Sequence, residues 1–147
     1  MSRKRAARHR RHDGGQALVE FSLVLTVFAL LLFGVFDMGR IVYVYTATSE
    51  AAREAARWGS VQFRSQTSAS RSSVASRAIG SLTAVPSPSA TATCSRDGTA
   101  VTDPDTCHAG DLLTVQVTSR VSPITPIIGQ LVPEITVTST AAVTVQQ

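Results

Sequence analysis

"GGQALVEFSLVLTVFALLLFGVFDMGR", residues 14–40, is the stretch that decides the fold of this chain. Its central part, residues 17–36, holds 20 residues and a single charged side chain, Glu20. A helix of that length rises about 30 Å, which matches the hydrocarbon core of a bilayer. Buried helices of soluble proteins are usually shorter and apolar on one side only. We therefore expect a transmembrane helix.

A cleaved secretory signal is the main alternative for this segment, because it also places an apolar run after a basic region. Its apolar core is about 7–15 residues long and ends at a small-residue cleavage site. Here the run is longer and is followed by DMGRIVYVYTATSE, residues 37–50, which continues in a helical pattern. These differences indicate a membrane span that is retained.

The basic charge of the protein is confined to its N-terminus. The 147 residues have a net charge of +4, but beyond residue 12 there are eight basic and ten acidic side chains. Such a tail could bind nucleic acid, anionic lipid headgroups, or hold the N-terminus in the cytoplasm beside a membrane helix. The nearby apolar run and the lack of aromatic side chains for base stacking favour the third role, with no nucleic-acid partner. The topology signal consists of Arg3, Lys4, Arg5, Arg8, Arg10 and Arg11.

The orientation follows from that signal, because positively charged flanks stay on the cytoplasmic side. We expect a single-pass protein of the cell membrane with a cytoplasmic N-terminus, an extracytoplasmic C-terminal part and membrane lipid as a partner. His9 and His12 in the tail lack the Cys or carboxylate cluster of a metal site.

Glu20 is the unusual residue of the apolar run. A carboxylate at the centre of a bilayer costs roughly 2.5–3.5 kcal/mol. Glu20 lies nearer the cytoplasmic edge and in the first turns of its helix, where the helix dipole favours negative charge. It is either an interfacial residue or a charge that waits for a partner.

The order of these features resembles type IV pilin-like proteins: a basic leader, a Gly, four residues, Glu followed by an aromatic residue, and a long apolar helix. In this chain it reads G-QALV-EF, residues 15–21. The longer stretch GQALVEFSLVLTVFALLLFGVFDMGRIVYVY…AAREAAR, residues 15–57, is similar to the TadE-like family. These are pilin-like membrane proteins of the tight-adherence (Flp pilus) machinery. Beyond residue 60 only the architecture is similar.

The resemblance implies a processing site between Gly15 and Gln16, where a prepilin peptidase would cut at the cytoplasmic face. Many pilins begin with Phe after the cut, whereas this chain would begin with Gln. Glu20, followed by Phe21, would be the fifth residue of the mature chain and would act as a charge register in assembly. The implied partners are other pilin-like subunits, pilus assembly proteins and the peptidase.

The residues themselves are compatible with that role. Cleavage would create an α-ammonium on Gln16, four positions before Glu20 and on the same helix face. Ammonium and carboxylate could then neutralise each other within one subunit or between neighbours, where the low dielectric strengthens their attraction.

The helix is expected to continue beyond the membrane. Asp37 and Arg40 follow the span and either pair across one turn or mark its polar boundary. TSEAAREAARWG, residues 48–59, is rich in good helix formers, and Gly59 is a plausible helix end. We expect a basic leader over residues 1–15 and one helix over about 16–58, the stem of a lollipop.

The rest of the chain divides into a linker and a small domain. Residues 59–92 are rich in Ser, Thr and Ala and predict a linker with a short helix near 72–81. Residues 93–147 predict a β-rich domain, because DLLTVQVTSRV and EITVTSTAAVTV alternate apolar and polar side chains. Two strands alone are marginal, so a third is expected near 90–94 or 100–102. SPITPIIGQLVP, residues 122–133, is either a flap packed on the stem or an exposed patch for a partner.

Cys94 and Cys107 are the only cysteines. An even count in an exported segment predicts a disulfide. Two metal-binding thiols are the weaker alternative, since no CxxC is present and only His108 is near.

The fold class is therefore α+β, a long transmembrane stem followed by a small extracytoplasmic domain with an antiparallel sheet. The sequence shows no Ser/His/Asp set, metal cluster or phosphate loop, so we expect no enzyme, cofactor or metal. The favoured function is a TadE-like minor pilin or pseudopilin. The alternative is a single-span envelope protein whose outer domain binds a partner without a filament role.

Overall fold

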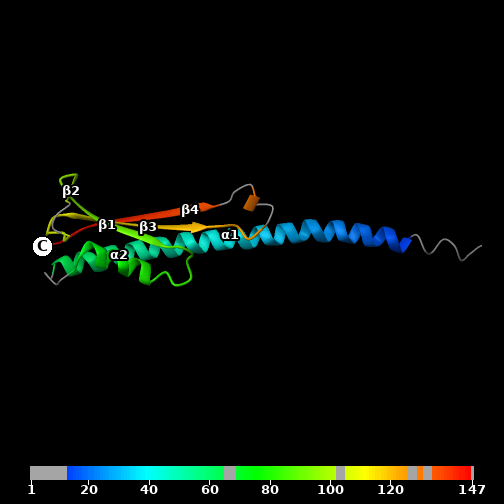
Figure 1. The fold of residues 1–147 in the computed structure, drawn as a ribbon, viewed down its shortest axis with the longest axis horizontal. Coiled ribbons are helices and arrows are strands. Elements are labelled where there is room, and N and C mark those ends of the chain that lie inside the picture. The colour runs from blue at the N-terminus through cyan, green and yellow to red at the C-terminus, as the bar shows by residue number, and fades with distance from the viewer. Residues whose placement is uncertain (1–12, 65–68, 102–104, 126–128, 131–133, 147) are drawn as a thin grey trace, which may run out of the picture.

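A computed structural model of the chain describes residues 13–64, 69–101, 105–125, 129–130 and 134–146. The expected basic leader therefore lies outside the described residues, apart from its last three positions. The elements in order are α1 (Asp13–Arg64), α2 (Arg71–Gly80), β1 (Ser89–Arg96), β2 (Thr99–Val101), β3 (Leu112–Val121) and β4 (Ile135–Thr144). Figure 1 shows α1 as a long rod whose N-terminal half projects alone, while the sheet and α2 gather along its C-terminal half. The predicted α+β lollipop is confirmed.

Helix α1 runs without a break for 52 residues because its sequence contains no proline. Its N-terminal part exposes apolar side chains all round, for example Leu31 at 67% and Val35 at 70%. By length and composition this helix can cross a membrane, and among the described residues it is the one helix that can. The chain thus fits a single-pass membrane anchor.

The C-terminal half of α1 is a core helix. Four alanines, Ala51, Ala52, Ala55 and Ala56, are buried, and their small side chains let the sheet approach closely. Thr48 is also buried and shares a hydrogen bond with Ser139 of β4, Oγ1 to Oγ at 3.1 Å. These small residues form the face on which the domain that follows α1, called the outer domain below, packs.

The helix end differs from the expectation, because α1 continues past residue 58 to Arg64. Gly59 is an interior position with a packing role. A Cβ built there would lie 2.7 Å from Cδ2 of Leu113 and 2.9 Å from Cγ2 of Val74. The glycine allows β3 and α2 to meet the stem at one point.

The sheet has four strands in the order β2-β1-β3-β4, and all neighbours are antiparallel. The two predicted strands are β3 and β4, and both positions considered for a third strand are occupied, by β1 and β2. Strand β3 alternates, with Leu113, Val115 and Val117 fully buried between exposed or half-buried polar residues. Helices α1 and α2 contact the sheet on this inner face, while the outer face is mostly threonine.

The segment expected as a linker, residues 59–92, is largely folded. It contributes the end of α1, all of α2 and the first half of β1. The short predicted helix is α2, which starts with a capping box between Ser70 and Ser73. Val74 and Ala78, four positions apart, bury one face of it in the core. A short amphipathic pattern hidden among serines explains why composition alone suggested a linker.

Gly59→Ala is expected to lower the free energy of unfolding of the outer domain by up to about 2 kcal/mol. Overpacking in a core costs roughly 1–3 kcal/mol, and the gain in helix propensity of about 1 kcal/mol offsets only part of it. Gly80→Ala in α2 is the matched control, because nothing lies within 4 Å of its Cβ position. Urea unfolding in detergent micelles, followed by near-UV circular dichroism, compares the two. Equal midpoints for both variants would contradict the tight contact at Gly59.

Candidate assembly site and membrane-proximal anchor

The residues of the predicted processing and register site lie at the start of α1. Gly15, Gln16, Glu20 and Phe21 are all helical and exposed. Glu20 has no hydrogen bond or ion pair with any residue that the structure describes. Gln16 and Glu20 are one helical turn apart, so an amine at residue 16 and the carboxylate share a face. This end of the stem therefore presents an unsatisfied negative charge beside apolar side chains.

The second carboxylate of the stem, Asp37, has a different environment. The backbone N–H groups of Ile124 and Thr125 donate to its two carboxylate oxygens at 3.0 and 3.1 Å. The Thr125 hydroxyl donates to Oδ2 at 2.6 Å. Asp37 is only 6% exposed, and three donors compensate the cost of removing its charge from water.

Arg40 binds the same connection between β3 and β4, since its Nη1 donates to the Ser122 carbonyl oxygen at 3.1 Å. The sequence left open whether Asp37 and Arg40 pair or mark the polar boundary of the span; in the described part of the chain they form no salt bridge. Both side chains hold the β3–β4 connection to the stem, so at Ser122, Ile124 and Thr125 this connection is a flap on α1. We name Asp37, Arg40, Ser122, Ile124 and Thr125 the membrane-proximal anchor. Its partners are 82–88 positions apart in sequence, and no local pattern signals such a contact.

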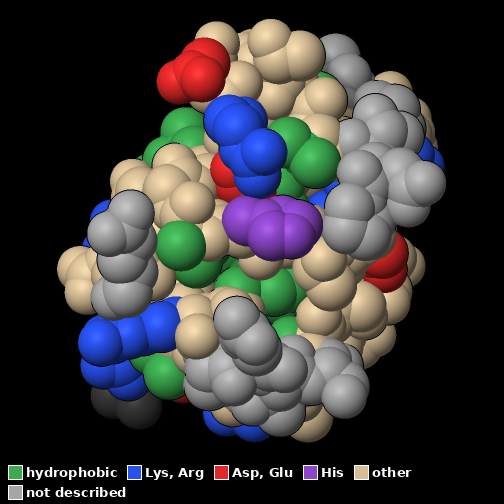
Figure 2. All heavy atoms as spheres, turned by 90° about the vertical axis from the view of Figure 1, so that its left-hand side faces the viewer, with side chains coloured by type: hydrophobic (Ala, Val, Ile, Leu, Met, Phe, Trp, Pro, Cys, Tyr) green, Lys and Arg blue, Asp and Glu red, His purple; other side chains and the backbone are tan. Residues whose placement is uncertain are grey.

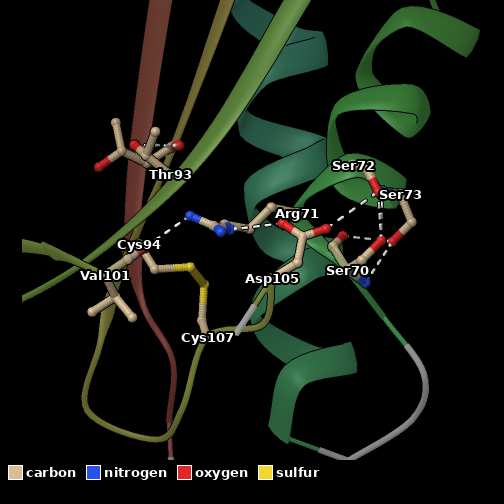
Figure 3. A network of polar contacts seen from close by, with 10 residues as sticks. Ser70, Arg71, Ser72, Ser73, Thr93, Cys94, Val101, Asp105 and Cys107 are labelled. Atoms are coloured by element: carbon tan, nitrogen blue, oxygen red, sulfur yellow. Dashed lines mark hydrogen bonds and ion pairs between the residues drawn. A yellow bond between two sulfur atoms is a disulfide. The ribbon is translucent and has the colours of Figure 1, made fainter. Parts of the chain in front are cut away.

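At the other end of the outer domain, Cys94 of β1 and Cys107 form a disulfide with a Cα–Cα distance of 5.7 Å. The predicted disulfide is confirmed, and both cysteines are buried. Arg71, at the start of α2, donates through Nε to Asp105 at 2.9 Å and through Nη1 to the Val101 carbonyl oxygen at 2.8 Å (Figure 3). These bonds tie the disulfide-closed loop to α2.

Asp111, just before β3, joins strand β1 and the His108 backbone at the same distal end by accepting their hydrogen bonds. Arg96 donates to it twice, Nε to Oδ1 at 2.7 Å and Nη2 to Oδ2 at 3.1 Å, and the His108 backbone N–H donates at 2.8 Å. The hydrogen bonds from Arg96 are the largest influence and hold the pKa of Asp111 below its ordinary value, although burial acts in the opposite direction. The same pairing raises the pKa of Arg96. This ion pair, between a buried carboxylate and a half-exposed guanidinium group, was not predicted from the sequence.

The distal end shows polar and charged side chains around one histidine, with hydrophobic side chains only in separate spots (Figure 2). His108 is the histidine within the described residues, and its Nδ1 lies 3.9 Å from Asp111. No group of three His, Cys, Asp or Glu side chains that could hold a metal occurs in the described segments.

These features define a class: an α+β protein with one long helix that fits a membrane anchor and a small disulfide-closed domain packed on its C-terminal half. Comparison with protein families gives a more specific similarity for the stem. The family model of TadE-like proteins matches residues 15–57, so the chain is similar to TadE-like proteins over the span and the first part of the core helix. The predicted resemblance is confirmed there. Comparisons with curated proteins and with solved structures gave no match.

The stability of the outer domain is expected to fall on acidification because of Asp111. Its pKa is lower in the folded than in the unfolded protein, so its contribution is present above the unfolded value, near 3.8, and is lost as the pH falls through the folded value. Asp111→Asn should lower the free energy of unfolding at pH 7 by about 1.5–3 kcal/mol and flatten the acid limb. Urea midpoints between pH 7 and 2.5 measure both effects.

Asp97→Asn is the control for that series, because Asp97 is exposed in the β1–β2 turn and Asn accepts its positive φ of 50°. It should keep the wild-type profile. An Asp111→Asn profile as steep as that of the wild type would assign the acid sensitivity to other groups.

Proposed function

We propose that this chain is a minor pilin or pseudopilin that takes part, without catalysis, in assembling a tight-adherence (Flp-type) pilus or a related secretion apparatus. The observation that carries the proposal is the TadE-like stem, with Glu20 exposed and unpartnered among the described residues, five positions after Gly15. A family match of this kind indicates a pilus-associated, pilin-like protein. The more specific role, that of a minor pilin or pseudopilin, rests on the geometry of the stem.

One face of the stem is an exposed apolar stripe on which another helix could pack. Leu31, Val35, Met38, Val42 and Tyr45 follow one another at spacings of four and three, the period of helices that pack side by side. Their exposed fractions range from 57 to 70%. The outer domain covers a different face of α1, so this stripe is free for pilin-like subunits or assembly proteins. It continues past residue 36, beyond the expected bilayer, where lipid alone would leave it uncovered.

Processing by a prepilin peptidase would prepare the stem for assembly. The cytoplasmic leader carries six cations that hold the N-terminus at the inner membrane surface. Cutting between Gly15 and Gln16 removes them and leaves an ammonium one turn from Glu20. A subunit whose two charges satisfy each other, or those of a neighbour, leaves the bilayer at lower cost.

The N-terminus of the native protein is the first test, and we expect Gln16 there. Intact mass and N-terminal peptide mapping of protein from its own membrane decide the point. Gly15→Leu should block the cut, because a bulky side chain prevents close approach of the backbone to a protease. Gly14→Ala is the matched control and should be processed normally. A native chain that retains Arg3–Arg11 would contradict processing and favour a permanently anchored envelope protein.

Glu20→Ala is expected to reduce co-purification with pilin-like subunits by about tenfold or more, a loss of about 1.4 kcal/mol. Membrane insertion should stay normal, because an apolar run inserts at least as well without its charge. Ser22→Ala is the control, since Ser22 is also exposed on the stem and bonds only its own helix at Val19. Unchanged co-purification would reduce Glu20 to an interfacial residue.

A further inference from the structure

We propose that the connection between β3 and β4 is a second membrane contact, in which Ile124 lies in the interfacial layer of the outer leaflet and Asp37 holds it there. The outer domain would then stand on the bilayer at two places, the stem and this foot. The proposal concerns membrane lipid only and does not depend on a role in pilus assembly.

The level of Ile124 relative to the membrane follows from its bond to the stem. The apolar run of residues 17–36 spans about 30 Å as a helix, so Asp37 begins the interfacial layer. The Ile124 backbone N–H lies 3.0 Å from the Asp37 carboxylate, which places Ile124 at the same level. Figure 1 shows the described part of this connection beyond the sheet, on the side of the projecting N-terminal half of α1.

The direction of the side chains supports a lipid contact. Ile124 is 67% exposed, although its neighbour Thr125 is buried against Asp37. Beyond α1, Ile124 is the most exposed large apolar side chain in the described segments; Leu112 at 40% and Ile79 at 39% come next. An isoleucine so exposed, one hydrogen bond from the edge of a membrane span, gains from burial in the headgroup and acyl boundary.

The sequence around Ile124 is suited to the same environment. Residues 122–133, SPITPIIGQLVP, contain no charged residue and five Ile, Leu or Val residues. Arginines flank it, Arg40 bonded to Ser122 and Arg120 within 3.8 Å of Glu134. Long basic side chains reach lipid phosphates from such positions. The carboxylate bonded to Ile124, that of Asp37, is covered by the connection and therefore shielded from anionic headgroups.

The test places a tryptophan at position 124. The background carries Trp58→Phe, which removes the single native tryptophan and keeps an aromatic ring under Arg77. Ile124→Trp and the control Thr140→Trp, on the exposed outer sheet face, are reconstituted in phosphatidylcholine–phosphatidylglycerol vesicles with and without brominated acyl chains. We expect bromine quenching several-fold stronger at position 124 than at position 140. Equal, weak quenching at both positions would overturn the proposal.

Two further measurements separate lipid from protein contact and test the anchor. If the emission of the Ile124→Trp variant is blue-shifted without bromine quenching, and the shift fades as the lipid-to-protein ratio rises, a second copy covers position 124 and the proposal fails. Adding Asp37→Ala to this variant should reduce the quenching at least twofold while near-UV circular dichroism shows an intact outer domain. Unchanged quenching would overturn the anchoring role of Asp37.

Discussion

The structure depends on one requirement: α1 must be compatible with lipid along its first half and with a protein core along one face of its second half. The first half of α1 must face lipid on all sides, and the second half must form the core of a small domain on one side. One unbroken helix fits both environments because its first half carries large apolar side chains all round. Its second half carries alanines on a single face, from Ala51 to Ala56. Because α1 is one unbroken helix, the outer domain has a fixed orientation relative to the part of α1 that can span a membrane.

Where the two halves meet, the chain buries a carboxylate. An isolated buried charge is costly, and Asp37 is tolerated because two backbone N–H groups and a hydroxyl converge on it. The backbone donors come from a connection that has no ladder to bond to after β3 ends at Val121. The N–H groups compensate the buried carboxylate, and the carboxylate accepts hydrogen bonds from N–H groups that have no strand partner. The start of the connection, at Ile124 and Thr125, is therefore ordered together with the stem. The Arg96–Asp111 pair and the disulfide stabilise the opposite end in the same way, by joining loops to strands.

The stem, β3 and β4 could be predicted from the sequence because each is specified by a local period: a continuous apolar run, or alternation of two. The disulfide followed from a count of cysteines in an exported segment. The membrane-proximal anchor could not be predicted, because Asp37 and Thr125 are 88 positions apart and only the sheet topology brings them together. The short helix α2 was expected near residues 72–81, but the helical position of Gly59 was missed for a related reason. Gly59 looks like a helix end, and tertiary packing by Val74 and Leu113 overrides that local signal.

The two carboxylates of the stem lie at opposite ends of the apolar run and differ in their partners. Glu20 and Asp37 are 17 positions apart, about 26 Å along a helix, so they lie close to the two edges of the hydrocarbon layer. Asp37 accepts hydrogen bonds from the domain that follows the stem, and these bonds join that domain to α1 at this end of the apolar run. Glu20 has no partner among the described residues, and under the proposed function an amine released at residue 16 or another molecule would supply one. Under the proposed function, the end of the span at Asp37 therefore holds a folded domain in place, and the end at Glu20 is the one that changes on processing.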